Sequence, residues 1–186
     1  MHTVVQELTG ASSAPSTHPS LTVPASSTPF AAPPTPDQVR LIQSTWLDLK
    51  PAGEQVGLLF YQRLFEIDPG LRPMFSRDLV PQARKLVAML SAVIDGLERL
   101  DALLPRVAAL GRRHAGYGVQ PAHYRTVGQA LIWTLRRGLG PSASEPVIGA
   151  WTAAYALLAD AMQTAATQHD AAIDCASVER PAQAAA

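Results

Sequence analysis

The stretch ALLPRVAALGRRHAGYGVQPAHY, from Ala102 to Tyr124, decides the fold. One face of its first half carries three aliphatic side chains and then an imidazole at helical spacing: Leu103, Val107, Leu110 and His114. Gly116 and Gly118 follow directly, and glycine just past a periodic run commonly ends a helix. The segment therefore predicts an amphipathic helix that ends shortly after a histidine.

The position of His114 suggests a specific chemistry. A neutral imidazole at a helix end, set against an apolar wall, suits a metal held in a flat hydrophobic cofactor, and haem is the common case. A histidine on an apolar face is more often a hydrogen-bonded core residue. The assignment of His114 as an iron ligand therefore depends on the rest of the chain.

The composition predicts one soluble domain. The 186 residues include 15 Lys+Arg and 15 Asp+Glu, so the formal net charge is 0 and no broad positive field attracts nucleic acid or an anionic membrane. Hydrophobic residues make up 47% and charged residues 16%, which is enough for one sizeable core. The single cysteine, Cys175, excludes an internal disulfide and a thiolate metal site, and fits a reducing compartment.

The two ends of the chain differ from its middle. Residues 1–34 are rich in Ser, Thr, Pro and Ala, which predicts a disordered leader before a domain at 35–170 and a flexible tail at 171–186. A gene-start error or a species-specific extension without a role would also explain the leader. The start MHTVVQELTG has no basic region, and no window reaches the roughly 18 apolar residues of a membrane span, so we expect a cytoplasmic protein.

Helix signals recur along the middle. Thr35 to Gln38 combine a capping-box spacing with proline at the first helical position. Further helices are expected at about 51–66, from about 81, from about 101, after 121, and from a second capping box at Ser142 to Glu145. No stretch alternates like a strand. The sequence predicts an all-α fold with six or so substantial helices.

Three strings then give a family resemblance. They are FYQRLFEIDPGLRPMF at residues 60–75, ALLPRVAALGRRHAGYGVQPAHYRTVGQAL at residues 102–131, and AWTAAYALLADAM at residues 150–162. From about Thr35 to Gln168 the chain resembles the globin domain of bacterial flavohaemoglobins and single-domain bacterial haemoglobins. The resemblance implies a globin fold of six to eight helices around a haem pocket, with haem b as the iron cofactor.

On one side of the haem, the resemblance makes His114 the proximal ligand. A tyrosine at the position of Tyr124 supports that histidine in flavohaemoglobins, together with a glutamate from the last helix. In this chain the residue that aligns with the glutamate is at about Gln168. The neutral side chain of Gln168 implies a weaker electron push on the iron. Tyr124 also fits an ordinary core aromatic at helical spacing.

On the other side, the resemblance places Tyr61, Gln82 and Leu86. The phenol and the carboxamide would donate hydrogen bonds to bound dioxygen, and Leu86 would screen the pocket sterically. Tyr61 also fits an interior tyrosine bonded to a backbone carbonyl. Gln82 also fits an exposed residue of a first helical turn, because Pro81 precedes it.

The resemblance implies further contacts with the cofactor. Phe75 would pack against the haem ring, and Leu110 and Val119 would line the pocket. Lys85 and Arg113 are candidates to pair with haem propionates, or else are solvated surface cations. The remaining histidines show no pattern of their own: His2, His18, His123 and His169.

The expected function follows from the resemblance. We expect a haem-binding bacterial haemoglobin that binds dioxygen reversibly and handles or transports oxygen or nitric oxide, with carbon monoxide as a further ligand. One alternative is a nitric oxide dioxygenase that uses a separate reductase, since no reductase sequence follows Gln168. Another is a haem-based gas or redox sensor. We expect a monomer or a homodimer.

Overall fold

The structure, a computed structural model, describes the backbone of residues 31–178 and the side chains of residues 31–168. Over this range every regular element is a helix, and the fold class predicted from the sequence is confirmed. Most of the expected leader lies outside the described residues. The α-helices are α1 Pro36–Leu49, α2 Gly53–Ile67, α3 Val80–Gly96, α4 Leu100–Gly116, α5 Pro121–Leu139 and α6 Glu145–Val178. Short 3-10 helices occupy Lys50–Ala52, Pro69–Met74 and Gly140–Ser142.

The start of α1 confirms the predicted capping box. The Thr35 hydroxyl accepts from the Gln38 backbone N–H at 3.3 Å, and the Gln38 side-chain oxygen accepts from the Thr35 N–H at 2.8 Å. Pro36 occupies the first helical position, where the missing N–H costs nothing. Helix α1 thus begins where the sequence signal indicates, and the chain already contacts the protein before it, since Pro34 is buried and the Ala31 N–H donates to Asp160 Oδ2 at 2.9 Å.

The last helix differs from the prediction at both ends. The expected capping box at Ser142 is wrong, because Ser142 belongs to the 3-10 turn that follows Gly140, and α6 begins at Glu145. Its first turn closes with the Ile148 N–H donating to the Ser144 carbonyl at 2.9 Å. At the other end α6 continues to Val178, beyond the expected domain limit at 170, since this alanine-rich stretch favours helix.

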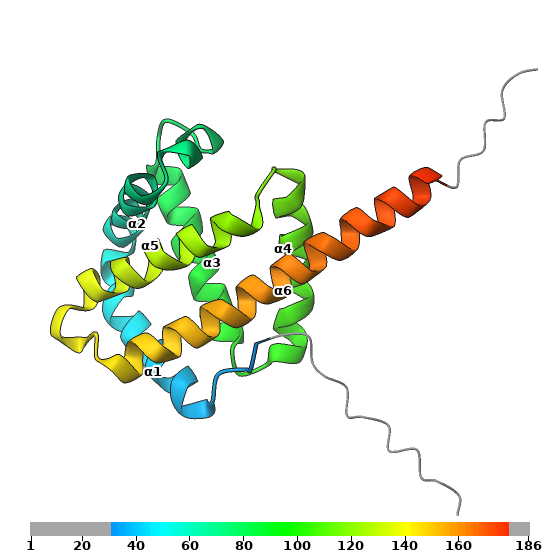
Figure 1. Ribbon diagram of the computed structural model, residues 1–186. Coiled ribbons are helices and arrows are strands. Elements are labelled where there is room, and N and C mark those ends of the chain that lie inside the picture. The colour runs from blue at the N-terminus through cyan, green and yellow to red at the C-terminus, as the bar shows by residue number, and fades with distance from the viewer. Residues whose placement is uncertain (1–30, 179–186) are drawn as a thin grey trace, which may run out of the picture.

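The helices pack in two crossing layers around one apolar core. In Figure 1, α5 and α6 run antiparallel, and the final turns of α6 extend past the other helices. Trp46 of α1 and Trp151 of α6 meet at the core with ring centroids 6.1 Å apart, and the Trp151 ring nitrogen donates to the Thr45 hydroxyl at 3.0 Å. These contacts fix α6 against α1.

A single glycine sets how closely α4 approaches α6. A Cβ atom on Gly111 would lie 2.6 Å from the backbone Cα of Met162, so only glycine fits at this crossing. The crossing lies one turn before His114. Gly111 therefore brings the end of α4, with its histidine, against the middle of α6.

None of the described helices is both long enough and apolar enough to cross a bilayer.

Candidate functional site

His114 lies in the last turn of α4, half-buried, with its ring orientation fixed by its own helix. Its Nδ1 atom lies 3.0 Å from the carbonyl oxygen of Leu110. A carbonyl only accepts, so Nδ1 carries the proton and donates, and the lone pair of Nε2 stays available for a metal. The helix ends at Gly116, and Gly118 then turns the chain with φ of 77°.

Two internal cavities flank the imidazole, and His114 lines both of them. The first cavity has a volume of about 150 Å³ and lies between the 3-10 helix Pro69–Met74, the α4–α5 corner and α5. Its walls include Phe75, Val119 and Tyr124. The second, of about 170 Å³, faces α3, and its walls include Leu86 and Leu110. The structure thus brings together five of the predicted pocket residues around His114.

The walls between the cavities consist of side chains shared by both. Besides His114, these are Val127 of α5 and Tyr155 and Met162 of α6. Ligand pockets usually hold about 300 Å³ or more, so each cavity alone is smaller than a typical cofactor site. Met162 is the most flexible of these side chains, because it is unbranched.

The chemistry of this site fits haem. The imidazole of His114 faces walls that are largely apolar, and such walls would suit a flat hydrophobic cofactor. Among the described residues, no group of three or more His, Cys, Asp or Glu side chains gathers to hold a bare metal ion. The apolar lining around His114 would therefore suit a porphyrin better than a bare metal ion.

Tyr61 packs into an aromatic cluster beside the first cavity. Its ring centroid lies 5.3 Å from that of Phe75, 6.0 Å from that of Phe65 and 5.2 Å from that of Phe60. Burial raises the pKa of the Tyr61 hydroxyl, so the group stays protonated and able to donate. Tyr61 is not itself a lining residue of either cavity; it contacts the pocket through Phe75.

The other predicted distal residues lie on α3. Gln82 is half-buried in the first turn of the helix and lines neither cavity. Leu86, one turn further on, does line the second cavity. The side of the site that faces α3 is therefore closed by aliphatic groups, with Gln82 just outside.

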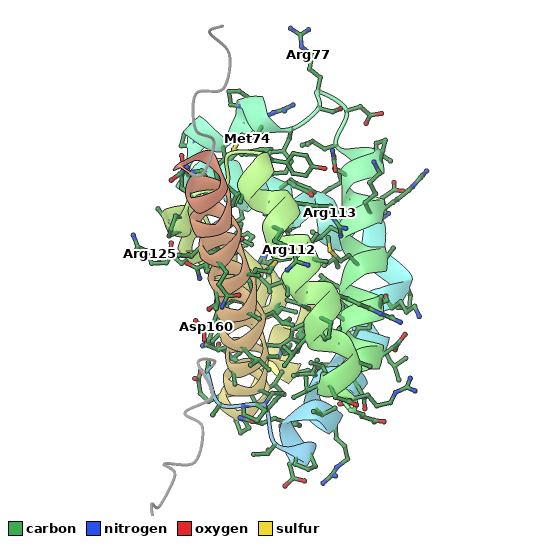
Figure 2. All side chains as sticks on the ribbon, turned by 90° about the vertical axis from the view of Figure 1, so that its right-hand side faces the viewer. Met74, Arg77, Arg112, Arg113, Arg125 and Asp160 are labelled. Atoms are coloured by element: carbon green, nitrogen blue, oxygen red, sulfur yellow. The ribbon has the colours of Figure 1, made fainter. Side chains whose placement is uncertain are left out.

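The predicted propionate partners and the predicted supporting glutamine are exposed. Lys85 on α3 and Arg113 on α4 both point to solvent; Figure 2 shows Arg113 beside Arg112 on α4. Gln168 is exposed on α6. It lies six residues after Met162, so its side chain is rotated by about 240° around the helix axis from that of Met162, away from the face that lines the cavities. Within the described residues no hydrogen bond joins Gln168 to His114 or Tyr124.

His123 is a pocket residue that the sequence reasoning missed. It lines the first cavity together with His114 and Tyr124. Its Nδ1 accepts from the Gln120 backbone N–H at 3.1 Å, which caps α5 and leaves Nε2 carrying the proton. His123 directly precedes Tyr124 in the first turn of α5, after the corner at Gly118. This position is the sequence feature that could have identified it as a pocket residue.

Tyr155 is the second missed residue. Its hydroxyl donates to the backbone carbonyl of Tyr124 at 2.5 Å, and burial, with a further contribution from nearby Tyr124, raises its pKa. Tyr155 follows Trp151 by four residues, so helical spacing puts the two on one face. Its ring separates the two cavities and ties α6 to the start of α5.

Comparison with known proteins agrees with this geometry. The family profile described as Globin matches residues 58–162, more than half of the chain. The chain belongs to the globin family. The match includes Tyr61, Phe75, His114 and Tyr124, so the candidate site lies inside the part of the chain that defines the family.

The curated relatives of this globin are longer proteins. It is 36% identical to a flavohemoprotein of Vibrio cholerae over 129 residues, which cover 67% of this chain and 32% of the relative. It is 32% identical to a flavohemoprotein of Bacillus subtilis over 126 residues, 66% of this chain and 32% of the relative. The globin thus spans about a third of the length of the curated relatives it matches.

Solved structures of similar size share the fold. A bacterial globin from Campylobacter jejuni superposes with a TM-score of 0.66 at 24% identity, over 74% of this chain and 99% of the other. An engineered carbene transferase from Rhodothermus marinus gives a TM-score of 0.67 at 27% identity, over 75% and 98%. These neighbours align over nearly their whole length with the helical part of this globin.

Proposed function

We propose that this globin binds haem b through Nε2 of His114 and uses it to bind dioxygen reversibly. The observation that carries the proposal is the bond from His114 Nδ1 to the Leu110 carbonyl, which leaves Nε2 as the free ligand atom between two apolar cavities. Bound haem would supply an iron atom with one open position for a diatomic ligand.

The chain's own residues would then hold the cofactor and exclude water. Phe75, Leu86 and Val119 would bury the cofactor, and Leu110, which lines the pocket, would orient the ligand histidine through its carbonyl. Lys85 and Arg113, which are exposed on α3 and α4, would pair with propionate groups at the protein surface.

Tyr61 is the proposed donor to bound dioxygen. Its hydroxyl accepts or donates no hydrogen bond among the described residues, and its raised pKa keeps the proton in place. A phenol that keeps its proton can donate a hydrogen bond to a polar ligand. Gln82, half-buried on the first turn of α3, would serve as a second donor after a small movement of that turn.

A second candidate function is conversion of nitric oxide and dioxygen to nitrate. It is favoured by the likeness to the Rhodothermus marinus protein, which is described as a proposed nitric oxide dioxygenase, and to flavohemoproteins. The chain matches about a third of the flavohemoprotein of Vibrio cholerae, so the test of this candidate supplies a flavin reductase. Nitric oxide consumption by the oxygenated protein, with and without an added flavin reductase, tests this candidate.

The primary test is an absorption spectrum of the purified full chain. Reduced protein should show a five-coordinate haem, and exposure to carbon monoxide should convert it fully to the carbonyl form. Protein that fails to take up haem after reconstitution would overturn the proposal. A six-coordinate reduced spectrum would show instead that a second side chain, with His123 and Met162 as the nearest candidates, occupies the open position.

A further inference from the structure

The side chain of Arg72 holds the backbone of loop 75–79, which joins the 3-10 helix Pro69–Met74 to α3. Its Nη1 atom donates to the carbonyl oxygens of Phe75 and Ser76 at 3.1 and 2.9 Å, and its Nη2 atom donates to that of Arg77 at 3.1 Å. Three consecutive carbonyl groups therefore converge on one guanidinium group. Because Arg72 is half-buried, these bonds are partly shielded from competition with water.

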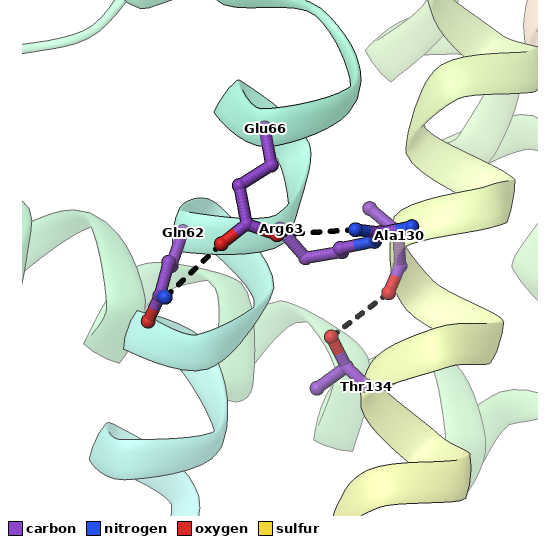
Figure 3. A network of polar contacts seen from close by, with 5 residues as sticks. All are labelled: Gln62, Arg63, Glu66, Ala130 and Thr134. Carbon is purple, nitrogen blue, oxygen red and sulfur yellow. Dashed lines mark hydrogen bonds and ion pairs between the residues drawn. The ribbon is translucent and has the colours of Figure 1, made fainter.

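This contact differs from those of the paired arginines in the described part of the chain. Arg63 pairs with Glu66 at 3.1 Å, as Figure 3 shows, and Arg84 pairs with Glu54 at 2.6 Å. Pairs of this kind near the surface contribute little to stability. No ion pair joins Arg72 to a carboxylate of the described residues, so backbone carbonyls are the groups that compensate its charge.

The same guanidinium group contacts the aromatic cluster around Tyr61. Its central carbon lies 5.2 Å from the centroid of the Phe65 ring, within the range of a cation–π contact. The centroid of the Phe65 ring lies in turn 5.5 Å from that of Phe75 and 6.0 Å from that of Tyr61. Arg72 thus touches the cluster twice, at the backbone of Phe75 and at the ring of Phe65.

Loop 75–79 leads directly into the start of α3. The Ser76 hydroxyl donates to the Asp78 carbonyl at 2.8 Å, and the Asp78 carboxylate accepts from the Val80 N–H at 3.0 Å. Val80 is the first residue of α3, and Gln82 lies in the same turn. A series of hydrogen-bonded residues therefore connects Arg72 to the turn that carries Gln82.

We propose that Arg72 is a positioning residue of the haem pocket, which acts through loop 75–79 and the aromatic cluster. The groups that it holds are Phe75 and the two proposed dioxygen donors, Tyr61 and Gln82, so the inference rests on the proposed function. A planar guanidinium group has five N–H donors and a flat face, and it can therefore serve three carbonyls and an aromatic ring at once. The Arg72→Lys substitution keeps the positive charge but offers one donor nitrogen in place of the two that Arg72 uses.

The first test compares haem retention and ligand release in Arg72→Lys and wild type, both as the haem-loaded full chain. Transfer of haem to an excess of a haem-scavenging apoprotein should accelerate roughly three- to tenfold, as expected for the loss of about one hydrogen bond from a charged donor. Dioxygen release should accelerate more than carbon monoxide release, because bound dioxygen depends more strongly on where the two donors lie.

Arg77→Gln is the matched control, because it removes a positive charge from the same loop. The Arg77 side chain is exposed, and Figure 2 shows it extending away from the helices. Within the described residues no hydrogen bond or ion pair involves that side chain, and the carbonyl that Arg72 binds is kept in the variant. Arg77→Gln should therefore retain haem and release both gases as wild type does.

A second measurement uses the full chain before haem is added. NMR relaxation order parameters of the backbone amides in loop 75–79 should fall from about 0.85, typical of a rigid backbone, to below about 0.6 in Arg72→Lys. They should stay at the wild-type value in Arg77→Gln. The amides of α5 should be unchanged in both variants, which separates a local loosening of the loop from a general loss of structure.

Two results would overturn the proposal. The first is wild-type order parameters for loop 75–79 in Arg72→Lys, even where the free energy of unfolding in urea falls, because Arg72 would then stabilise the fold without positioning the loop. The second is haem loss that is unchanged in Arg72→Lys, or accelerated equally in Arg77→Gln. Failure of the wild-type chain to take up haem would instead refute the proposed function, and the order parameters would still decide whether Arg72 holds the loop.

Discussion

The imidazole of His114 donates from Nδ1 to the carbonyl oxygen of Leu110 one turn earlier on α4, over 3.0 Å. The ring is therefore oriented by its own helix and by a neutral acceptor, and no carboxylate of the described residues is hydrogen-bonded to it. A neutral acceptor polarises the imidazole less than a carboxylate would, so the histidine remains a moderate electron donor. In the proposed haem complex, this arrangement would favour reversible ligand binding over chemistry that needs a strongly electron-rich iron.

Replacement of His114 tests the ligand assignment directly. His114→Gly should lose stable haem binding, because only burial of the ring and propionate contacts would remain. Added free imidazole should enter the space left by the side chain and restore the haem spectrum. His123→Ala is the control, since His123 lines the same cavity but its Nδ1 is engaged in capping α5. Full haem content in His114→Gly without imidazole would contradict the assignment.

Tyr61→Phe tests the distal donor. Loss of a hydrogen bond to a partly charged acceptor costs about 1.5 to 3 kcal/mol, so dioxygen release should accelerate by roughly one to two decades. Carbon monoxide release should change little, because its bound form places less negative charge on the outer oxygen. Stopped-flow measurements with both gases decide the matter. Equal acceleration for the two gases would point to a steric effect of the altered aromatic cluster.

The helical pattern predicted most of the fold because local signals govern helix ends. Thr35 and Gln38 specify the start of α1 through a capping box that needs no tertiary context. The start of α6 was misplaced by two residues because Ser142 and Ser144 offer competing caps, and the turn after Gly140 selects Ser144. The length of α6 was underestimated because its alanines carry high helix propensity but little amphipathic pattern.

The candidate site was predictable where one face of one helix carries it, as with Leu110 and His114. It was less predictable where two helices contribute. Tyr155 lies on the apolar face of α6, but its bond to the Tyr124 carbonyl depends on how α5 and α6 cross, which spacing does not encode. The close approach at Gly111 likewise depends on Met162, which is 51 positions later in the printed sequence.

Gly111→Ala probes that close approach. The added methyl group would meet the backbone of Met162, which cannot rotate away, so the helices must separate. We expect a loss of about 1–3 kcal/mol in the free energy of unfolding, together with weaker haem binding. Gly149→Ala is the matched control on α6, because nothing lies within 4 Å of its Cβ position, and it should stabilise by about 0.5–1 kcal/mol. Equal effects of the two substitutions in urea denaturation would refute the argument.

Tyr155 also predicts a dependence of stability on alkaline pH. Burial raises its pKa above the ordinary value of 10.0, so the unfolded chain releases this proton at lower pH than the folded chain does. Stability from this group is complete below pH 10 and falls as pH rises, by up to about 1.4 kcal/mol per unit. Tyr155→Phe should be less stable at pH 7 but show a shallower decline above pH 10.

Tyr117→Phe is the control for this titration, because Tyr117 is 71% exposed and its removal should leave the slope unchanged. Thermal or urea unfolding at several pH values between 8 and 12 gives the slopes. A Tyr155→Phe variant with the slope of wild type would show that other groups, such as buried Tyr61 or Tyr124, carry the alkaline response.

The final prediction concerns the electron push on the iron. Gln168 is exposed and faces away from His114, so Gln168→Glu should leave both the iron reduction potential and peroxidase turnover unchanged. Ala166 lies four residues after Met162 and so on the face of α6 that borders the cavities. Ala166→Glu would place a carboxylate toward His114 and Tyr124, increase the imidazolate character of the ligand, and lower the potential by on the order of 50 mV. Spectroelectrochemical titration of both variants separates these cases: a fall in potential for Gln168→Glu would mean that the end of α6 turns its other face toward the haem.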